Sequence, residues 1–114
     1  MVLPGESGDS GVDSLLDAIR VAASDGSIVF AKQASSSIVG YKCHEPTVRR
    51  LLSKVSLDDL DGDVEEAENY PGCVMLTLHV PGRCSSFAVD LWYSHVAVSQ
   101  KTGRVIVASW KPCS

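Results

Sequence analysis

Residues 72–110 read GCVMLTLHVPGRCSSFAVDLWYSHVAVSQKTGRVIVASW, and this stretch decides the fold. It is rich in aliphatic, β-branched and aromatic residues, and 81–84 (PGRC) and 101–104 (KTGR) have the residue types of turns. The pattern predicts strands at 73–80, at 85–93 with a continuation to 99, and at 104–110. Consecutive strands with short turns predict an antiparallel arrangement.

The alternation of apolar residues predicts how the first two strands pair. The even-numbered residues of 73–80 are all aliphatic, and Phe87, Val89 and Leu91 form the apolar set of the next strand. Facing the two sets together is favoured because a slip of one residue would turn a core face to water. The predicted partners are Leu78 with Phe87, Leu76 with Val89, and Val74 with Leu91.

Two features follow from this register further along the chain. Val96 and Val98 have the opposite parity to Phe87, which predicts a β-bulge or a break in the strand near Tyr93–Ser94. A two-residue loop at the second turn would set Val98 opposite Val107. It would also set Ala97 opposite Ala108 and His95 opposite Trp110.

The N-terminal half predicts two helices and one further hairpin. Apolar residues at helical spacing indicate a helix at 11–24 and another at 46–55, the second beginning at Pro46. Dense β-branched residues at 27–33 and 37–43 predict a hairpin. The predicted fold class is therefore α+β, with an antiparallel sheet of about five strands and two helices packed on one face. Residues 1–9 are predicted to be a loose segment, and 10–114 a single small domain.

Composition excludes several classes of function. The 114 residues are 45% hydrophobic and carry a net charge of −4, which disfavours nucleic-acid binding. No apolar run reaches the ~20 residues that span a bilayer, and no signal peptide opens the sequence, so we expect a soluble cytoplasmic protein. Reduced thiols are then expected at Cys43, Cys73, Cys84 and Cys113. If a leader has been removed, two disulfides with three possible connectivities are the alternative.

An acidic segment precedes the first long strand and is the strongest local charge in the sequence. It holds seven carboxylates in eleven residues: Asp58, Asp59, Asp61, Asp63, Glu65, Glu66 and Glu68. Aligned as an EF-hand loop on Gly62, it has Leu57 where the first calcium ligand must be, so calcium is not predicted. A negative field of this kind suits a basic protein partner.

The favoured function is a non-catalytic binding or regulatory domain, such as an inhibitor, adaptor or immunity-protein-like domain. The acidic segment would provide one part of the surface, and a sheet face bearing Trp92 and Trp110 the other, because exposed tryptophans mark binding surfaces. No cofactor is predicted, and zinc-ligand spacings and phosphate-binding glycine motifs are missing from the sequence. An edge strand at 27–33 or 104–110 could pair across a homodimer axis.

A cysteine hydrolase is the alternative. Cys43 lies just before a predicted helix, whose N-terminus would stabilise a thiolate, and His95 on a strand could act as the base. This order resembles that of papain-like peptidases and amidases, and SHVAVSQKTGRVIVAS is similar to the histidine hairpin of cell-wall amidases in that group. The resemblance implies Cys43 and His95 as catalytic residues. The sequence departs from it on the last strand, where an orienting His, Asn or Asp is expected and only Ser109 is present.

Overall fold

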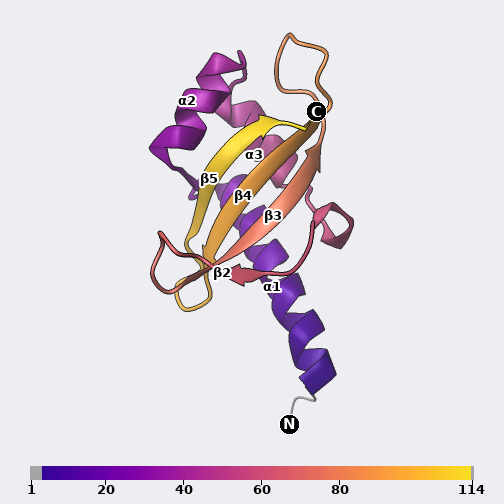
Figure 1. Ribbon diagram of the computed structural model, residues 1–114, viewed down its shortest axis with the longest axis vertical. Coiled ribbons are helices and arrows are strands. Elements are labelled where there is room, and N and C mark those ends of the chain that lie inside the picture. The colour runs from indigo at the N-terminus through magenta and orange to yellow at the C-terminus, as the bar shows by residue number, and fades with distance from the viewer. Residues whose placement is uncertain (1–3, 114) are drawn as a thin grey trace.

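The computed structural model describes the backbone of residues 4–113 and the side chains of residues 11–113. It is a compact single α+β domain in which three α-helices accompany one five-stranded mixed sheet. The elements in chain order are α1 (Pro4–Asp25), β1 (Val29–Phe30), α2 (Lys32–Gly40), α3 (Glu45–Leu52), the 3₁₀ helix η1 (Leu57–Asp59), β2 (Glu65–Glu66), β3 (Cys73–Pro81), β4 (Leu91–Ser99) and β5 (Val105–Pro112). Figure 1 shows β3, β4 and β5 in front, α1 and α3 behind them, and α2 beside β5.

The sheet has the strand order β1-β5-β4-β3-β2. All neighbours are antiparallel except β1, which runs parallel to β5. The edge strands β1 and β2 have two residues each, so the three long strands provide most of the sheet. The segment predicted as an edge at 104–110 is flanked on both sides, because β1 pairs with Ile106 and Val107.

The core lies between the helices and one face of the sheet. α1 contributes Leu15, Leu16 and Ile19 at the spacing that the sequence predicted for its apolar stripe. The even-numbered residues of β3 and β4 point into this core, together with alternate residues of β5. The sheet members of the core are Leu76, Leu78, Val80, Trp92, Ser94, Val96, Val98, Val105, Val107 and Trp110.

The predicted helices are confirmed, with different ends. α3 begins at Glu45 with proline in its first turn, as expected, and ends at Leu52 rather than at 55. α1 begins at Pro4, so residues 4–9, predicted to be loose, are helical, and proline again occupies the first turn. Residues 1–3 of the predicted loose segment lie outside the described residues.

The hairpin predicted at 27–33 and 37–43 is wrong. Only Val29–Phe30 forms a strand there, and residues 32–40 form α2. Ala34 and Ile38, four residues apart, are both buried against the core, which favours one helical face over strand alternation. The tertiary contact therefore overrides the strand propensity of the β-branched residues.

The predicted β3–β4 register is also wrong, because β4 begins at Leu91 instead of residue 85. Residues 82–90 form a loop that is closed by a hydrogen bond from Gly82 N to Asp90 O (2.8 Å). Phe87 lies in this loop with 48% of its surface exposed, and it does not pair with Leu78. The observed partners are Val74 with Val98, Leu76 with Val96, Leu78 with Ser94, and Val80 with Trp92.

The bulge occurs at a different place from the one predicted. β4 pairs with β3 without interruption from Leu91 to Ser99, so Tyr93–Ser94 is regular. The irregularity lies between β4 and β5, where His95 pairs with Ser109 and Val96 with Val107, leaving Ala108 as the extra residue. At the second turn Val98 faces Val105, Ala97 faces Ile106 and Ser94 faces Trp110, which corrects the register predicted there.

Candidate functional site

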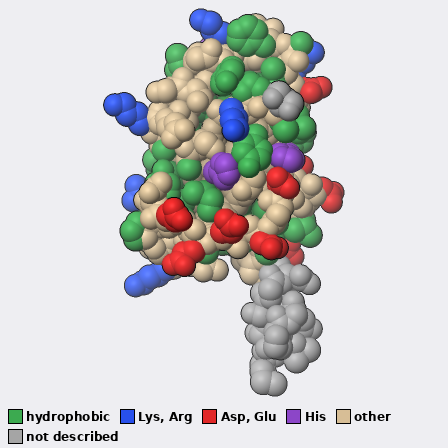
Figure 2. Space-filling view, in the orientation of Figure 1, with side chains coloured by type: hydrophobic (Ala, Val, Ile, Leu, Met, Phe, Trp, Pro, Cys, Tyr) green, Lys and Arg blue, Asp and Glu red, His purple; other side chains and the backbone are tan. Residues whose placement is uncertain are grey.

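The sheet face turned away from the helices is the candidate site, and we call it the open face. Its side chains alternate along the strands with those of the core, and most are partly exposed. They are Cys73, Met75, Thr77 and His79 of β3, Tyr93, His95 and Ala97 of β4, and Ile106, Ser109 and Lys111 of β5. Figure 2 views this face and shows histidine side chains near its centre, with acidic side chains gathered toward the end where β2 lies.

His95 is held at the centre of the open face by its neighbours. Its Nδ1 lies 2.9 Å from Ser109 Oγ, which also accepts a hydrogen bond from the His95 backbone N–H (3.1 Å). Its Nε2 lies 3.5 Å from Tyr93 Oη, and the two rings meet edge to face. Partial burial lowers the pKa of His95 below its ordinary value of 6.5, the positive charge of Lys111 lowers it further, and Glu65 opposes the shift. The lowered pKa favours the neutral imidazole, and the contacts with Ser109 and Tyr93 orient its ring.

A second histidine and a lysine surround the same tyrosine. His79 stacks at an angle on Tyr93, with the ring centroids 5.5 Å apart, and its Nε2 lies 3.5 Å from Asp61 Oδ2. Lys111 places its Nζ 5.1 Å from the centroid of the Tyr93 ring, a cation–π arrangement. A hollow of about 350 Å³ opens beside these three side chains, with Pro112 and Cys113 also lining it. Tyr93 is therefore the centre of an amphipathic cluster that borders this hollow.

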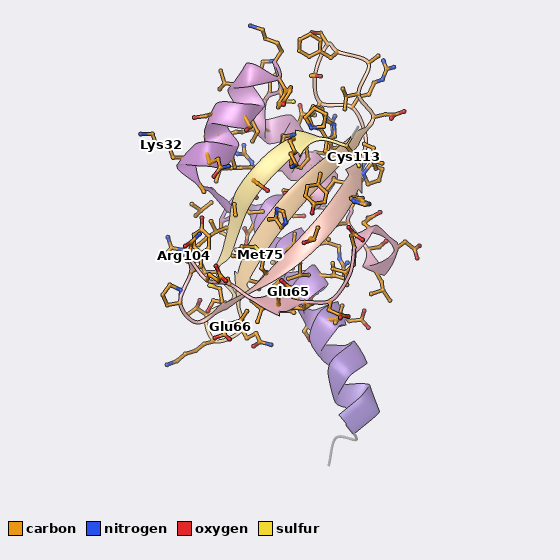
Figure 3. The ribbon with its side chains drawn as sticks, viewed as in Figure 1. Lys32, Glu65, Glu66, Met75, Arg104 and Cys113 are labelled. Atoms are coloured by element: carbon orange, nitrogen blue, oxygen red, sulfur yellow. The ribbon has the colours of Figure 1, made fainter. Side chains whose placement is uncertain are left out.

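The acidic loop, residues 58–68, borders the open face along β3. Its backbone is attached to that strand by the bridge between Leu60 and Leu78 and by a hydrogen bond from Asp61 N to Thr77 O (2.8 Å). β2 continues the attachment by pairing Glu65 with Met75, and Figure 3 shows these two residues at one end of the sheet, away from Cys113. No Lys or Arg occurs between Lys54 and Arg83, so the carboxylates of the loop have no basic residue near them in sequence.

Not every acidic residue that the sequence singled out is free for a ligand. The Asp59 carboxylate accepts a hydrogen bond from Ser56 N (3.0 Å) in the capping box of η1, and Asp61 pairs with His79. The remaining residues of the predicted set are exposed and have no side-chain hydrogen bond or ion pair among the described residues. They are Asp58, Asp63, Glu65 and Glu66.

The two tryptophans do not belong to the open face. Trp92 is 0% exposed and Trp110 is 1% exposed, and their rings stack in the core with centroids 5.4 Å apart. The Trp92 indole donates a hydrogen bond to Gly82 O (3.0 Å). The prediction that they form a binding surface is wrong, because β4 turns its even-numbered residues toward the helices. Sequence reasoning overlooked Tyr93 and His79, although their odd numbering places them on the opposite face.

The alternative catalytic pair is not assembled either. Cys43 belongs to the core on the helix side of the sheet, with its sulfur 2.8 Å from that of Cys84. His95 lies on the open face and makes its contacts with Ser109 and Tyr93. The sheet separates the thiol from the imidazole, so Cys43 and His95 form no catalytic dyad. Ser109, which the sequence offered in place of an orienting residue, does contact the histidine ring.

The described residues were compared with the requirements of a metal centre and of a membrane span. Among the side chains of residues 11–113, no group of three or more His, Cys, Asp or Glu is arranged to hold a metal ion. No helix within residues 4–113 is long and apolar enough to cross a membrane. Comparison of the chain with protein-family models, with curated proteins and with solved structures finds no match.

Proposed function

We propose that this chain is a non-catalytic binding domain that recognises a basic segment of a protein partner. The open face provides the platform, and the acidic loop provides the charge beside it. The observation that carries the proposal is the junction of the acidic loop with the open face, where Asp61 Oδ2 lies 3.5 Å from His79 Nε2 and Glu65 pairs with Met75. The aromatic cluster and the acidic loop thus form one continuous surface.

The chemistry of the surface fits an extended, cationic peptide. Exposed carboxylates attract lysine and arginine over a distance of about 10 Å at moderate salt, which guides the encounter. Tyr93 and His79 line the hollow and offer aromatic surface to the apolar parts of the partner's side chains. Thr77 and Ser109 add hydroxyl groups that can pair with a peptide backbone.

A titration with hexalysine, followed by NMR of ¹⁵N-labelled protein, tests the proposal. We expect shift changes at Tyr93, His95 and the acidic loop, and an affinity that falls as salt is raised. Replacing Asp63 with Asn and Glu66 with Gln should weaken binding by roughly 2- to 30-fold, because each exposed charge pair contributes about 0.2–1 kcal/mol.

The matched control is Asp13→Asn with Asp17→Asn, which removes the same charge from an exposed part of α1. It should leave the affinity within about twofold of the wild type, since these charges lie outside the acidic loop. Equal weakening by both double variants would mean that net charge alone drives binding. Shift changes confined to α1, or no saturable shift at low salt, would refute the open face as the site.

A further inference from the structure

Two cysteines from distant parts of the chain meet at the helix side of the sheet. Cys43 follows Lys42, whose left-handed backbone (φ 60°) ends the turn after α2. The Cys43 N–H donates a hydrogen bond to Ile38 O (2.8 Å). Cys84 lies in the 82–90 loop between β3 and β4, 41 residues away in sequence. Their sulfur atoms are 2.8 Å apart, and a disulfide bond of about 2.05 Å needs only a small further approach.

The surroundings of Cys84 keep its sulfur in place. Burial raises the pKa of the Cys84 thiol to about 12, with a further contribution from the adjacent Cys43 thiol. The Trp110 indole N–H has a smaller, opposite effect on the pKa of the same thiol. That N–H is buried and has no hydrogen-bond partner among the described residues. The sulfur of Cys84 is therefore seated against the core and directed at Cys43.

A redox reagent can reach this pair. Cys43 and Cys84 are 6% and 7% exposed, and both line a cavity of about 780 Å³ between the α2–α3 turn and the 82–90 loop. Lys42 and His44 line the cavity from the turn, and Phe87 lines it from the loop. The basic side suits an anionic thiol compound such as glutathione.

We infer that Cys43 and Cys84 form a reversible disulfide that joins the α2–α3 turn to the 82–90 loop across this cavity. In the first step the Cys43 thiolate attacks one sulfur of glutathione disulfide, forming a mixed disulfide and releasing one glutathione thiolate. Cys84 then loses its proton and attacks the Cys43 sulfur, releasing the second glutathione. The protein loses two electrons and two protons, and glutathione disulfide is reduced to two molecules of glutathione.

The fold permits one disulfide within the chain. Cys73 begins β3 opposite Ser99, whereas Cys113 N donates to Leu91 O at the other end of β4. The length of β4 separates these positions, about 26 Å at the usual rise per residue. The two disulfides considered from the sequence therefore cannot both form within the folded chain. Oxidation should remove two thiols and leave Cys73 and Cys113 free.

The experiment equilibrates the folded protein with glutathione and glutathione disulfide at several ratios, followed by alkylation, intact mass and peptide mapping. We expect one product, lighter by two hydrogen atoms before alkylation, that links Cys43 to Cys84. Cys43→Ser and Cys84→Ser should each abolish it, and the double variant Cys73→Ser, Cys113→Ser should retain it. A different linkage, a stable glutathione adduct only, or four alkylated thiols at every ratio would overturn the inference.

Repeating the equilibration in urea separates the effect of the fold from chance pairing. The equilibrium constant for forming the Cys43–Cys84 bond should be roughly 30- to 900-fold larger in the folded chain than in the unfolded chain, the range expected for a native disulfide. A ratio near one would overturn the inference even if the bond were detected. The disulfide does not depend on the open face, so the binding proposal and the disulfide succeed or fail separately.

Discussion

Replacing Gly82 with alanine should destabilise the protein more than any other exchange of a glycine for alanine at a described turn. Gly82 starts the 82–90 loop with φ 127°, and its carbonyl accepts the Trp92 indole hydrogen bond. A Cβ at this position would overlap Leu51 Cδ2 and lie 3.3 Å from Cδ1. The backbone strain of a non-glycine residue at positive φ costs about 1–2 kcal/mol, and forcing Leu51 aside adds about 1–3 kcal/mol.

Two control variants isolate these contributions. Gly103 has φ 76°, and a Cβ added there would have no atom within 4 Å, so Gly103→Ala should show the backbone strain alone. Gly40 ends α2 without positive φ and also has open space, so Gly40→Ala should be neutral or stabilise by up to about 1 kcal/mol. Urea unfolding followed by the fluorescence of Trp92 and Trp110 measures all three. A Gly82→Ala cost no larger than that of Gly103→Ala would refute the packing of the 82–90 loop against α3.

Further predictions concern titrating groups and one buried hydroxyl. The NMR titration midpoint of His95 should lie below 6.5, rise in Lys111→Met and fall in Glu65→Gln. Folding lowers the pKa of His95 below its unfolded value of 6.5, so the folded state favours the neutral ring. The stabilisation linked to neutral His95 is therefore complete above pH 6.5 and is lost as the pH falls below 6.5. His95→Gln should therefore flatten the decline of the urea midpoint below pH 6.5. The raised pKa of Cys84 predicts that the reduced protein loses stability as the pH rises from about 9 toward about 12, since the unfolded chain releases the proton first, and Cys84→Ala should reduce this slope. Ser94→Ala should cost about 1 kcal/mol in urea unfolding, because it removes the 2.7 Å hydrogen bond from the buried Ser94 hydroxyl to the partly buried carbonyl of Ser109.

The sequence predicts the fold class because its strongest patterns are long. The apolar stripe of α1 and the alternation of β3 each extend over enough residues to exclude another structure. α2 is short, and Ala34 and Ile38 are its only buried residues. A pattern of two positions cannot compete with the strand propensity of Ile38 and Val39, so only the tertiary contact identifies the helix.

The sequence predicts the candidate site only in part. The acidic loop follows from composition, and the structure places it beside the open face. The Cys43–Cys84 contact could not be predicted from the sequence. The two cysteines are 41 residues apart and belong to no common motif, and Cys43 follows a turn in which Lys42 has a left-handed backbone. Such a contact depends on how the α2–α3 turn and the 82–90 loop are placed in the folded chain, and local residue propensities do not determine that placement.

The wrong choice of face has a single origin in the parity of β4. If Phe87 faces the core, the odd-numbered residues of the strand face the helices, whereas if Val96 does, the even-numbered residues face them. The register predicted from the sequence places Phe87 in the core. Burying Trp92 and stacking it on Trp110 removes more apolar area from water than burying Phe87 would, since tryptophan is the larger side chain. The even-numbered residues therefore face the helices, and residues 85–90 become loop. Because alternation is strict, this choice also turns Tyr93 and His95 outward toward the acidic loop. Trp92 thus determines the open face by its burial, and no partner needs to touch it.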